Sequence, residues 1–343
     1  MKTTTIAIDV AKNVFEIAVS NRPGKVAQTH RLSRTKLLRF FAQQPAATVV
    51  LEACTSAHHW ARELEALGHQ PVLLPPAYVR PYVRRNKTDH ADACAILEAF
   101  RNEEIRPVPV KTVPQQTLTA LHRLRSQWLG DRVARVNTLR GLLREFGVFI
   151  PVGARKVVPA VWELIEDSES GLPDALRPAL AEACLEIRDL EKRVKACEND
   201  LKALSRQMPE AQQLQTIPGI GLLTATALVA LVGDVRRFPT ARHFASYLGL
   251  TPRERSSGQV RRLGRISKQG NSYLRMLLVH GARSLLWSAR RREQPDRLQS
   301  WALKKQQSRG HNKAAVATAN KLARIVWAVW SRHEQYQSQM LAA

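Results

Sequence analysis

The sequence predicts a mixed α/β domain at the N-terminus, then a helical coiled-coil spacer, then a mostly helical and strongly basic C-terminal domain. Three observations lead to this fold class. Short alternating or continuous apolar runs mark the first third of the chain, helical and heptad spacings mark the middle, and positive charge gathers in the last third. We place the domain boundaries at 1–147, 148–206 and 207–343, which suits a chain of 343 residues.

The strand signals lie in the first 105 residues. The meander formed by the first three strands precedes a fourth, continuously apolar strand of the kind that is covered on both faces. Helices at Arg34–Gln43 and His58–Leu67 alternate with the later strands, which indicates a mixed sheet in an α/β layer. The expected strands are Thr3–Val10, Val14–Ser20, Val26–Leu32, Ala47–Ala53 and Gln70–Leu74.

Two acids close strands of this sheet, since Asp9 ends the first strand and Glu52 ends the fourth. If those strands are neighbours, as in ribonuclease-H-like sheets, their carboxylates meet at one edge. The next acids open the helix within Asn86–Leu97, where Asp89 and Asp92 stand three apart and are therefore neighbours on one helix face. Thr88 or Asp89 can serve as the N-cap of this helix.

Four carboxylates that converge on one point cannot all stay ionised without a cation between them. They suit two hard divalent ions of the kind that catalyse phosphodiester chemistry. The competing interpretation treats the acids as ordinary turn and first-turn residues, which the helix dipole favours. The order of a strand-end Asp, a strand-end Glu and an Asp pair on a helix favours the metal site.

Charge restricts the partners. The chain has 53 Lys and Arg against 29 Asp and Glu, a net charge of +24. Nucleic acid is the first candidate for so basic a protein, and a membrane surface is the competitor. No run of about 18 uncharged apolar residues exists, and the N-terminal stretch is too soon charged for a signal peptide. Four cysteines without a regular framework favour reduced thiols and a cytoplasmic location.

The middle of the chain contains two long helical segments. Gln115–Phe146 has an apolar side and an arginine-rich side, which can be a solvated face or can follow a phosphate backbone. Glu182–Leu204 carries apolar residues at alternating steps of four and three, a heptad seam. This seam can pair with a second copy of the chain or fold back on the first helix, and the sequence leaves both open.

The basic half begins with Thr216–Gly221 and the apolar run Leu222–Val232, a pattern typical of a helix-hairpin-helix. Gly219 and Gly221 allow a tight turn, and amides at the following helix N-terminus can hold a phosphate. A simple helix–helix turn is the alternative. From position 236 to 313, 19 Lys and Arg stand against 3 acids, so we expect the main polyanion surface here, with strongly salt-dependent binding.

An arginine-dense loop, Gly249–Gly270, precedes the amphipathic helix Asn271–Leu286. A serine hydroxyl among these cations can attack a phosphodiester, because the cations stabilise the developing charge. The alternative is that Ser256 and Ser257 only hydrogen-bond a phosphate. The candidate nucleic-acid-binding cations of the loop are Arg253, Arg255, Arg261, Arg262, Arg265 and Lys268.

The segments AIDVAK, LEAC, RNKTDHADA, IPGIG, GLTPRERSSG and SKQGNSYLR occur in this order along nearly the whole chain. Together they resemble the DEDD-type insertion-sequence transposases, the one-ten family with its eleven-eleven subgroup. The resemblance implies a RuvC-like (RNase H-like) N-terminal domain with a long C-terminal helix, a coiled-coil spacer and a C-terminal transposase domain. It also implies a bacterial, nucleoid-associated recombinase, a dimer to tetramer, guided by a structured non-coding bridge RNA on donor and target DNA.

Carried over to this sequence, the resemblance assigns Mg²⁺ binding to Asp9, Glu52, Asp89 and Asp92. It assigns the nucleophile to Ser257, the serine before Gly258 in the GLTP…SG context, and Ser256 is the neighbour that confuses this assignment. The stretch LEACTSAHHW departs from the family, where a glycine and an aromatic residue often follow the glutamate.

Our hypothesis from the sequence is therefore a metal-dependent DNA recombinase in which Ser257 forms a covalent serine–DNA intermediate. One rival is a hydrolytic nuclease similar to junction resolvases, in which the acids activate water and Ser257 only binds. The other is a catalytically silent nucleic-acid-binding protein, which explains the charge but leaves the four acids without a role.

Overall fold

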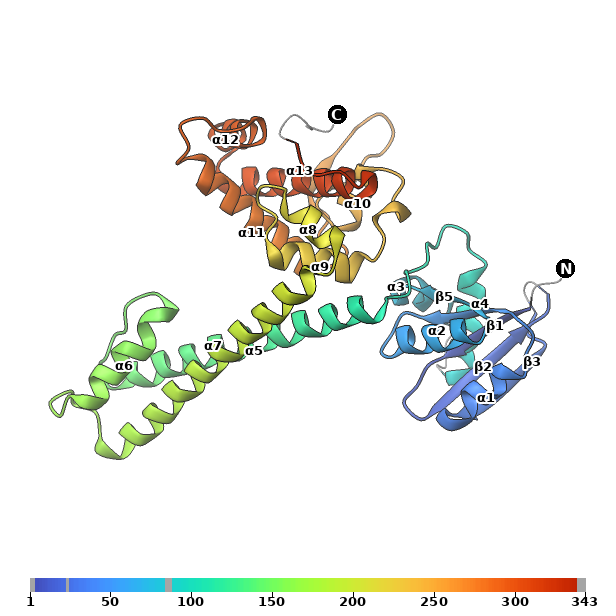
Figure 1. Ribbon diagram of the computed structural model, residues 1–343, viewed down its shortest axis with the longest axis horizontal. Coiled ribbons are helices and arrows are strands. Elements are labelled where there is room, and N and C mark those ends of the chain that lie inside the picture. The colour runs from blue at the N-terminus through green and yellow to red at the C-terminus, as the bar shows by residue number, and fades with distance from the viewer. Residues whose placement is uncertain (1–3, 23–24, 84–87, 338–343) are drawn as a thin grey trace. The chain divides into compact units, whose positions relative to one another are not determined.

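The computed structural model describes residues 4–22, 25–83 and 88–337, apart from the side chains of Asp89 and His90. The chain divides into two compact units, Met1–Thr112 and Val113–Ala343, and each is described here by itself (Figure 1). The long helix that the sequence analysis placed in the first domain is part of the second of these units. Within the described ranges, no helix is both long and apolar enough to cross a membrane.

The first unit contains a five-stranded sheet in the order β3-β2-β1-β4-β5. The strands β1, β2 and β3 form an antiparallel meander, whereas β1 pairs with β4 and β4 with β5 in parallel. The predicted mixed sheet is confirmed, including the adjacency of the first and fourth strands. The strands are β1 (Thr5–Asp9), β2 (Val14–Ser20), β3 (Gln28–Ser33), β4 (Thr48–Glu52) and β5 (Gln70–Leu74).

Helices cover the two faces of this sheet differently. On one face, Ile8 and Leu51 pack with Trp60 of α2 and with residues of α1. On the other face, Ala7 and Val50 pack with residues of α4. Small residues on this second face let α4 approach the sheet closely. The helices of the first unit are α1 (Leu37–Ala42), α2 (Ala57–Ala66), α3 (Pro76–Val79) and α4 (Asp89–Phe100).

The second unit is helical apart from one hairpin. Its helices are α5 (Val113–Glu145), α6 (Val157–Glu166), α7 (Arg177–Ser205), α8 (Pro209–Gln215), α9 (Leu222–Val232), α10 (Ala241–Tyr247), α11 (Ser272–Ala289), α12 (Arg297–Arg309) and α13 (His311–Arg332). The hairpin consists of β6 (Pro252–Glu254) and β7 (Leu263–Ile266), within the stretch that the sequence analysis treated as a loop.

Helices α5 and α7 lie side by side and antiparallel (Figure 1). The heptad seam of α7 therefore folds back on α5, one of the two alternatives that the sequence left open. The arginine-rich side of α5 is used in the same contact, because three arginines form ion pairs with glutamates of α7. The pairs are Arg125–Glu198 at 2.7 Å, Arg132–Glu191 at 2.6 Å and Arg135–Glu186 at 2.6 Å.

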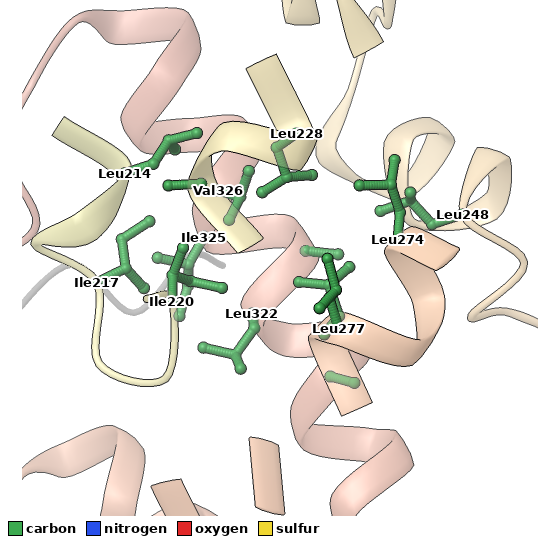
Figure 2. Packing of buried hydrophobic residues seen from close by; sticks show 14 of the residues in the cluster. Leu214, Ile217, Ile220, Leu228, Leu248, Leu274, Leu277, Leu322, Ile325 and Val326 are labelled. Carbon is green, nitrogen blue, oxygen red and sulfur yellow. The ribbon is translucent and has the colours of Figure 1, made fainter. Parts of the chain in front are cut away.

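The helices from α8 to α13 share one large apolar core, to which leucine and isoleucine side chains of α8, α9, α11 and α13 contribute (Figure 2). The Thr216–Gly221 turn enters this core through Ile217 and Ile220, which are 1% and 2% exposed. Gly219, with φ of +86°, lies against the backbone of Gly281 in α11, so closely that a Cβ on either residue would overlap the other. A Cβ on Gly221 would meet nothing, so only the first of the two predicted glycines is required by the turn.

Candidate active site

Strand register brings the first two predicted acids together. In the parallel pair β1–β4, Ile8 lies opposite Leu51, so the next residues, Asp9 and Glu52, end neighbouring strands at the same level. Neighbouring strands lie about 4.8 Å apart, and residues in register point to the same face. Ile8 and Leu51 face α1 and α2, so alternation turns the two acids toward the face that α4 covers.

A third acid, Asp92, lies on this same side of the sheet. It stands one helical turn before Ala95 and Ile96, residues by which α4 packs on the sheet, and is therefore on the sheet-facing side of the helix. The direction of α4 follows from its other end, where Leu97 and Phe100 line a cavity together with Thr5 at the start of β1. The N-terminal end of α4 consequently points toward the ends of β1 and β4.

Thr88 caps this helix, as one of the two sequence alternatives predicted, because its hydroxyl accepts a hydrogen bond of 3.2 Å from the amide of Ala91. Residues 85–87 of the RNKTDHADA segment and the side chain of Asp89 lie outside the described residues. Among the described residues, no three His, Cys, Asp or Glu side chains are grouped closely enough to hold a metal ion by themselves. The carboxylates of Asp9, Glu52 and Asp92 are hard oxygen ligands, the type that divalent cations such as Mg²⁺ select.

Burial and the negative charges of the strand-end acids both shift the pKa of the half-buried Cys54 thiol. Burial raises its pKa, and the negative charges of Glu52 and Asp9 raise the pKa further. Both carboxylates therefore act on one point just beyond β4, as their register requires.

His58 of α2 accepts a hydrogen bond of 3.2 Å from the amide of Lys111. Burial, together with the positive charges of Lys111 and Arg62, lowers the pKa of His58 to about 4, so this histidine is neutral at pH 7.

One acid at this edge escaped the sequence analysis. Glu16 of β2 lies directly opposite Asp9 in the antiparallel register, and alternation places it on the same face. Its carboxylate forms an ion pair of 3.3 Å with Arg31 of β3. The residues of VFEIAVS alternate between the two faces of the sheet. This alternation places Glu16 on the face opposite to that of its two neighbours in the strand, and it was the available signal in the sequence.

The candidate nucleophile lies in the second unit, at the tip of the β6–β7 hairpin. Ser257 and Val260 exchange backbone hydrogen bonds of 3.3 and 3.2 Å across a two-residue turn. Gly258 has φ of +57°, a conformation that the first central residue of such a turn requires and that glycine adopts without strain. Within the part of the chain that the structure describes, no hydrogen bond reaches the Ser257 hydroxyl, which is exposed on the hairpin.

The neighbouring serine is engaged in holding the hairpin together. The Ser256 hydroxyl donates to Oε1 of Glu254 at 2.7 Å and accepts from the backbone amide of Arg262 at 3.2 Å. Arg261 completes this group through an ion pair of 3.4 Å with the same oxygen of Glu254. The two serines therefore have different environments, one within a network that closes the hairpin and the other at its turn.

Five of the six predicted cations line one cavity of about 580 Å³ on the hairpin. They are Arg253, Arg255, Arg262, Arg265 and Lys268, while Arg261 is paired with Glu254 instead. Lys268 has φ of +57°, a strained conformation for a residue with a side chain, and such strain is concentrated at functional sites. Ser257 does not line this cavity.

The base of the hairpin is fixed by close backbone packing. Gly249 and Gly270 both have positive φ, and a Cβ on Gly249 would overlap the backbone of Gln269, while one on Gly270 would overlap that of Tyr247. The guanidinium of Arg275 joins the same elements, because it donates to the carbonyl of Leu248 at 3.1 Å and to that of Gln269 at 2.8 Å. The hairpin therefore rises from a rigid junction of α10 and α11.

The Thr216–Gly221 turn lines a second groove of the basic unit, which also includes His280 and Ser284 of α11. The first residues of α9, Leu222 to Thr224, also line this groove, and amides at a helix N-terminus are suitable ligands for a phosphate. The turn and the short helix α8 join two helices that share the core.

The chain combines a mixed sheet, whose adjacent strands end in carboxylates, with a strongly basic helical unit. These features are typical of a protein that acts on nucleic acid. Comparison with known families gives the particular class. Residues 211–299 match the family described as "Transposase IS116/IS110/IS902 family". Residues 6–148 match the IS110 DEDD family described as "Transposase".

Relatives cover almost the entire chain. A "Probable family 20 transposase" of Pseudomonas aeruginosa is 41% identical over 338 residues, which span 98% of this chain and 99% of the relative. The "Transposase for insertion sequence element IS1111A" of Coxiella burnetii is 37% identical, over 97% of this chain and 91% of the relative. The "Transposase for insertion sequence element IS1328" of Yersinia enterocolitica is 38% identical, over 95% and 96%. The chain belongs to the IS116/IS110/IS902 family of insertion-sequence transposases, as the resemblance of its motifs predicted.

Proposed function

We propose that this transposase is a metal-dependent DNA recombinase in which Ser257 attacks a backbone phosphate and becomes covalently linked to DNA. The observation that carries the proposal is the environment of the two hairpin serines. Ser256 is held by Glu254 and the Arg262 amide, whereas Ser257 is exposed at the turn of the same hairpin, whose cavity is lined by five cations. A nucleophile needs such access, and the cations stabilise the charge that develops on the phosphate.

In the proposed step, the Ser257 oxygen forms a bond to phosphorus as the bond from phosphorus to one DNA oxygen breaks. The serine proton leaves with a base or water, and the departing DNA oxygen takes up a proton. The phosphodiester energy is retained in the serine–phosphate bond, so a later attack by another DNA hydroxyl can rejoin strands without a high-energy cofactor. Arg255, Arg262 and Arg265 bind the phosphate and hold it for attack.

The acids of the first unit would hold the divalent metal. Asp9, Glu52 and Asp92 face one side of the sheet at one end, and Asp89 belongs to the same helix as Asp92. A bound Mg²⁺ pair would supply Lewis-acid polarisation of the phosphate and a lowered pKa of the attacking hydroxyl. We propose that the acids and the serine act on one phosphate within a homo-oligomer, in which different subunits can contribute each part.

Target choice is proposed to depend on a structured non-coding guide RNA. The net charge of +24 remains after every acid of the chain has been counted, which suits a protein that binds donor DNA, target DNA and RNA together. Recognition by base pairing needs little base-reading chemistry in the protein. Sequencing of RNA that co-purifies with the protein tests this, and a preparation that recombines DNA after complete removal of RNA would contradict it.

The covalent intermediate is tested by denaturing the protein during reaction with end-labelled DNA and Mg²⁺, followed by gel analysis. Wild type and Ser256→Ala should both retain labelled DNA, and Ser257→Ala should retain none. An adduct on Ser257→Ala would overturn the proposal. Nicked DNA without attached protein would favour the hydrolytic alternative, and no cleavage at all by wild type with its RNA would favour a binding protein.

A further inference from the structure

An exposed tryptophan on α11 has no role in the core of the second unit. Trp287 is 57% exposed, although Trp330 of α13 in the same unit is only 5% exposed. A large indole in water gains nothing from burial, so its position on the surface calls for another explanation. It belongs to an exposed strip of α11 at helical spacing, Met276, His280, Arg283 and Trp287, and the exposed Arg291 follows two residues after the helix ends.

The ring of Trp287 is already paired with a cation. The guanidinium carbon of Arg291, four residues on, lies 3.6 Å from the ring centroid, so a planar charged group covers one face of the indole. Trp287 remains more than half exposed despite this contact. An aromatic ring together with a guanidinium plane is the combination on which unpaired bases stack.

Two more arginines, Arg283 before Trp287 in the chain and Arg290 after it, are held by neighbouring helices. Arg283 donates to Oδ1 of Asn312 in α13 at 3.4 Å, and Arg290 donates to Oε1 of Gln306 in α12 at 3.2 Å. Both acceptors are neutral amides, so the arginine charges are positioned and are not neutralised by these bonds. Between positions 283 and 313, nine Lys and Arg stand against two acids, Glu293 and Asp296. The strip is therefore complementary to a polyanion.

We propose that Trp287 and Arg291 form a stacking platform for an unpaired base of a single-stranded nucleic acid, with Arg283 and Arg290 contacting the flanking phosphates. Bases inside a duplex are stacked on each other and do not offer a free face, so the platform selects single strands. The inference rests on the proposed function in one respect, since strand exchange and a structured RNA both present unpaired bases. It does not depend on the serine chemistry.

The test measures binding of the full-length protein to labelled oligothymidine, oligouridine and duplex DNA by fluorescence anisotropy at one fixed salt concentration. Trp287→Ala should weaken binding to a single strand about tenfold and to the duplex less than twofold, because stacking is lost and phosphate contacts remain. Trp287→Tyr should restore most of the affinity. If Trp287→Ala weakens binding of oligouridine alone, the ligand of the platform is RNA, and if it weakens binding of oligothymidine alone, the ligand is DNA. Weaker binding of both single strands supports a platform that does not distinguish the two sugars.

Tyr78→Ala is the matched control, because Tyr78 is an exposed aromatic residue, 60% exposed, in the first unit. It should bind all three ligands as wild type does. Equal loss on duplex and single strand after Trp287→Ala, or loss on neither single strand, would overturn the proposal. A binding-independent measurement is the fluorescence of 2-aminopurine in the single strand, which stacking quenches; quenching that persists unchanged in Trp287→Ala would also overturn it. Ser257→Ala should bind single strands as wild type does. The outcome of this test therefore does not depend on whether Ser257 is the nucleophile.

Discussion

The carboxylates of the first unit end strands whose interior residues are buried, whereas the serine of the second unit lies at the tip of an exposed hairpin. The acids obtain their positions from strand register and from a helix that packs on the sheet. The serine obtains its position from a two-residue turn above a junction of glycines. Metal binding requires carboxylates held to within a fraction of an ångström, and a sheet provides this. A nucleophile that must reach DNA needs exposure, which a hairpin provides.

The largest effect should follow from removing one charge at the sheet. Asp9→Asn or Glu52→Gln should lower strand-transfer activity about a hundredfold to a thousandfold, because metal-ion stabilisation of the transition state is worth several kcal/mol. Binding of DNA by the basic unit should change little. Glu16→Gln is the matched variant on the same face, since its carboxylate is already paired with Arg31. Equal loss from Glu16→Gln would show that the sheet edge works as a general acidic patch.

The second effect concerns the junction below the hairpin. Gly270→Ala should destabilise the second unit by about 3 kcal/mol or more, because it combines positive φ with overlap against the backbone of Tyr247. Gly258→Ala has positive φ but open space around the added carbon, and should cost about 1 kcal/mol. Chemical denaturation of each variant measures the difference. Similar costs at both sites would contradict the rigid junction.

The third effect is a dependence of the stability of the second unit on pH. His122 of α5 is buried and bonded to Tyr273 of α11 at 2.9 Å and to Thr226 of α9 at 2.9 Å. Burial, followed by the charge of Arg125, lowers the pKa of His122 to about 4. The unfolded chain therefore binds a proton near pH 6.5 that the folded protein does not bind until about pH 4, so stability rises with pH across this window.

Between pH 6.5 and pH 4 this histidine alone should lower the free energy of unfolding by about 3 kcal/mol. Denaturation of wild type and His122→Asn over this range measures the contribution. The variant should be less stable at pH 7 but should have a shallower dependence on pH. If the pH dependence of stability were unchanged in the variant, the contact between α5, α9 and α11 would tolerate a charged His122 imidazole in the folded protein.

The smallest effect distinguishes cations that meet DNA from cations that meet protein. Arg255→Gln and Arg262→Gln, in the hairpin cavity, should each reduce the slope of log affinity against log salt for duplex DNA by about 0.9. Arg135→Gln should leave the slope unchanged, because its guanidinium is paired with Glu186 of α7 at 2.6 Å. A reduced slope for Arg135→Gln would show that α5 also binds the DNA backbone.

Much of the fold followed from the sequence because local patterns encode local elements. The alternation of Val14–Ser20 and the continuous run at Ala47–Ala53 predicted strands that the structure contains, the second at Thr48–Glu52. The cap at Thr88 and the seam of α7 were equally local signals. The hairpin of Pro252–Ile266 was missed, because glycines and arginines dominate this stretch and its strands are only three and four residues long.

The sequence by itself determined the family, the charge, and the residue types that could carry the chemistry, since motifs and composition do not depend on contacts. Only the tertiary structure decided that Asp9 and Glu52 end neighbouring strands on the face under α4, that α7 folds back on α5, and that Ser256 rather than Ser257 is held by Glu254. The physical reason is the same in each case. Strand register, helix pairing and side-chain hydrogen bonds are set by partners distant in the chain, and no local pattern specifies which partner is chosen.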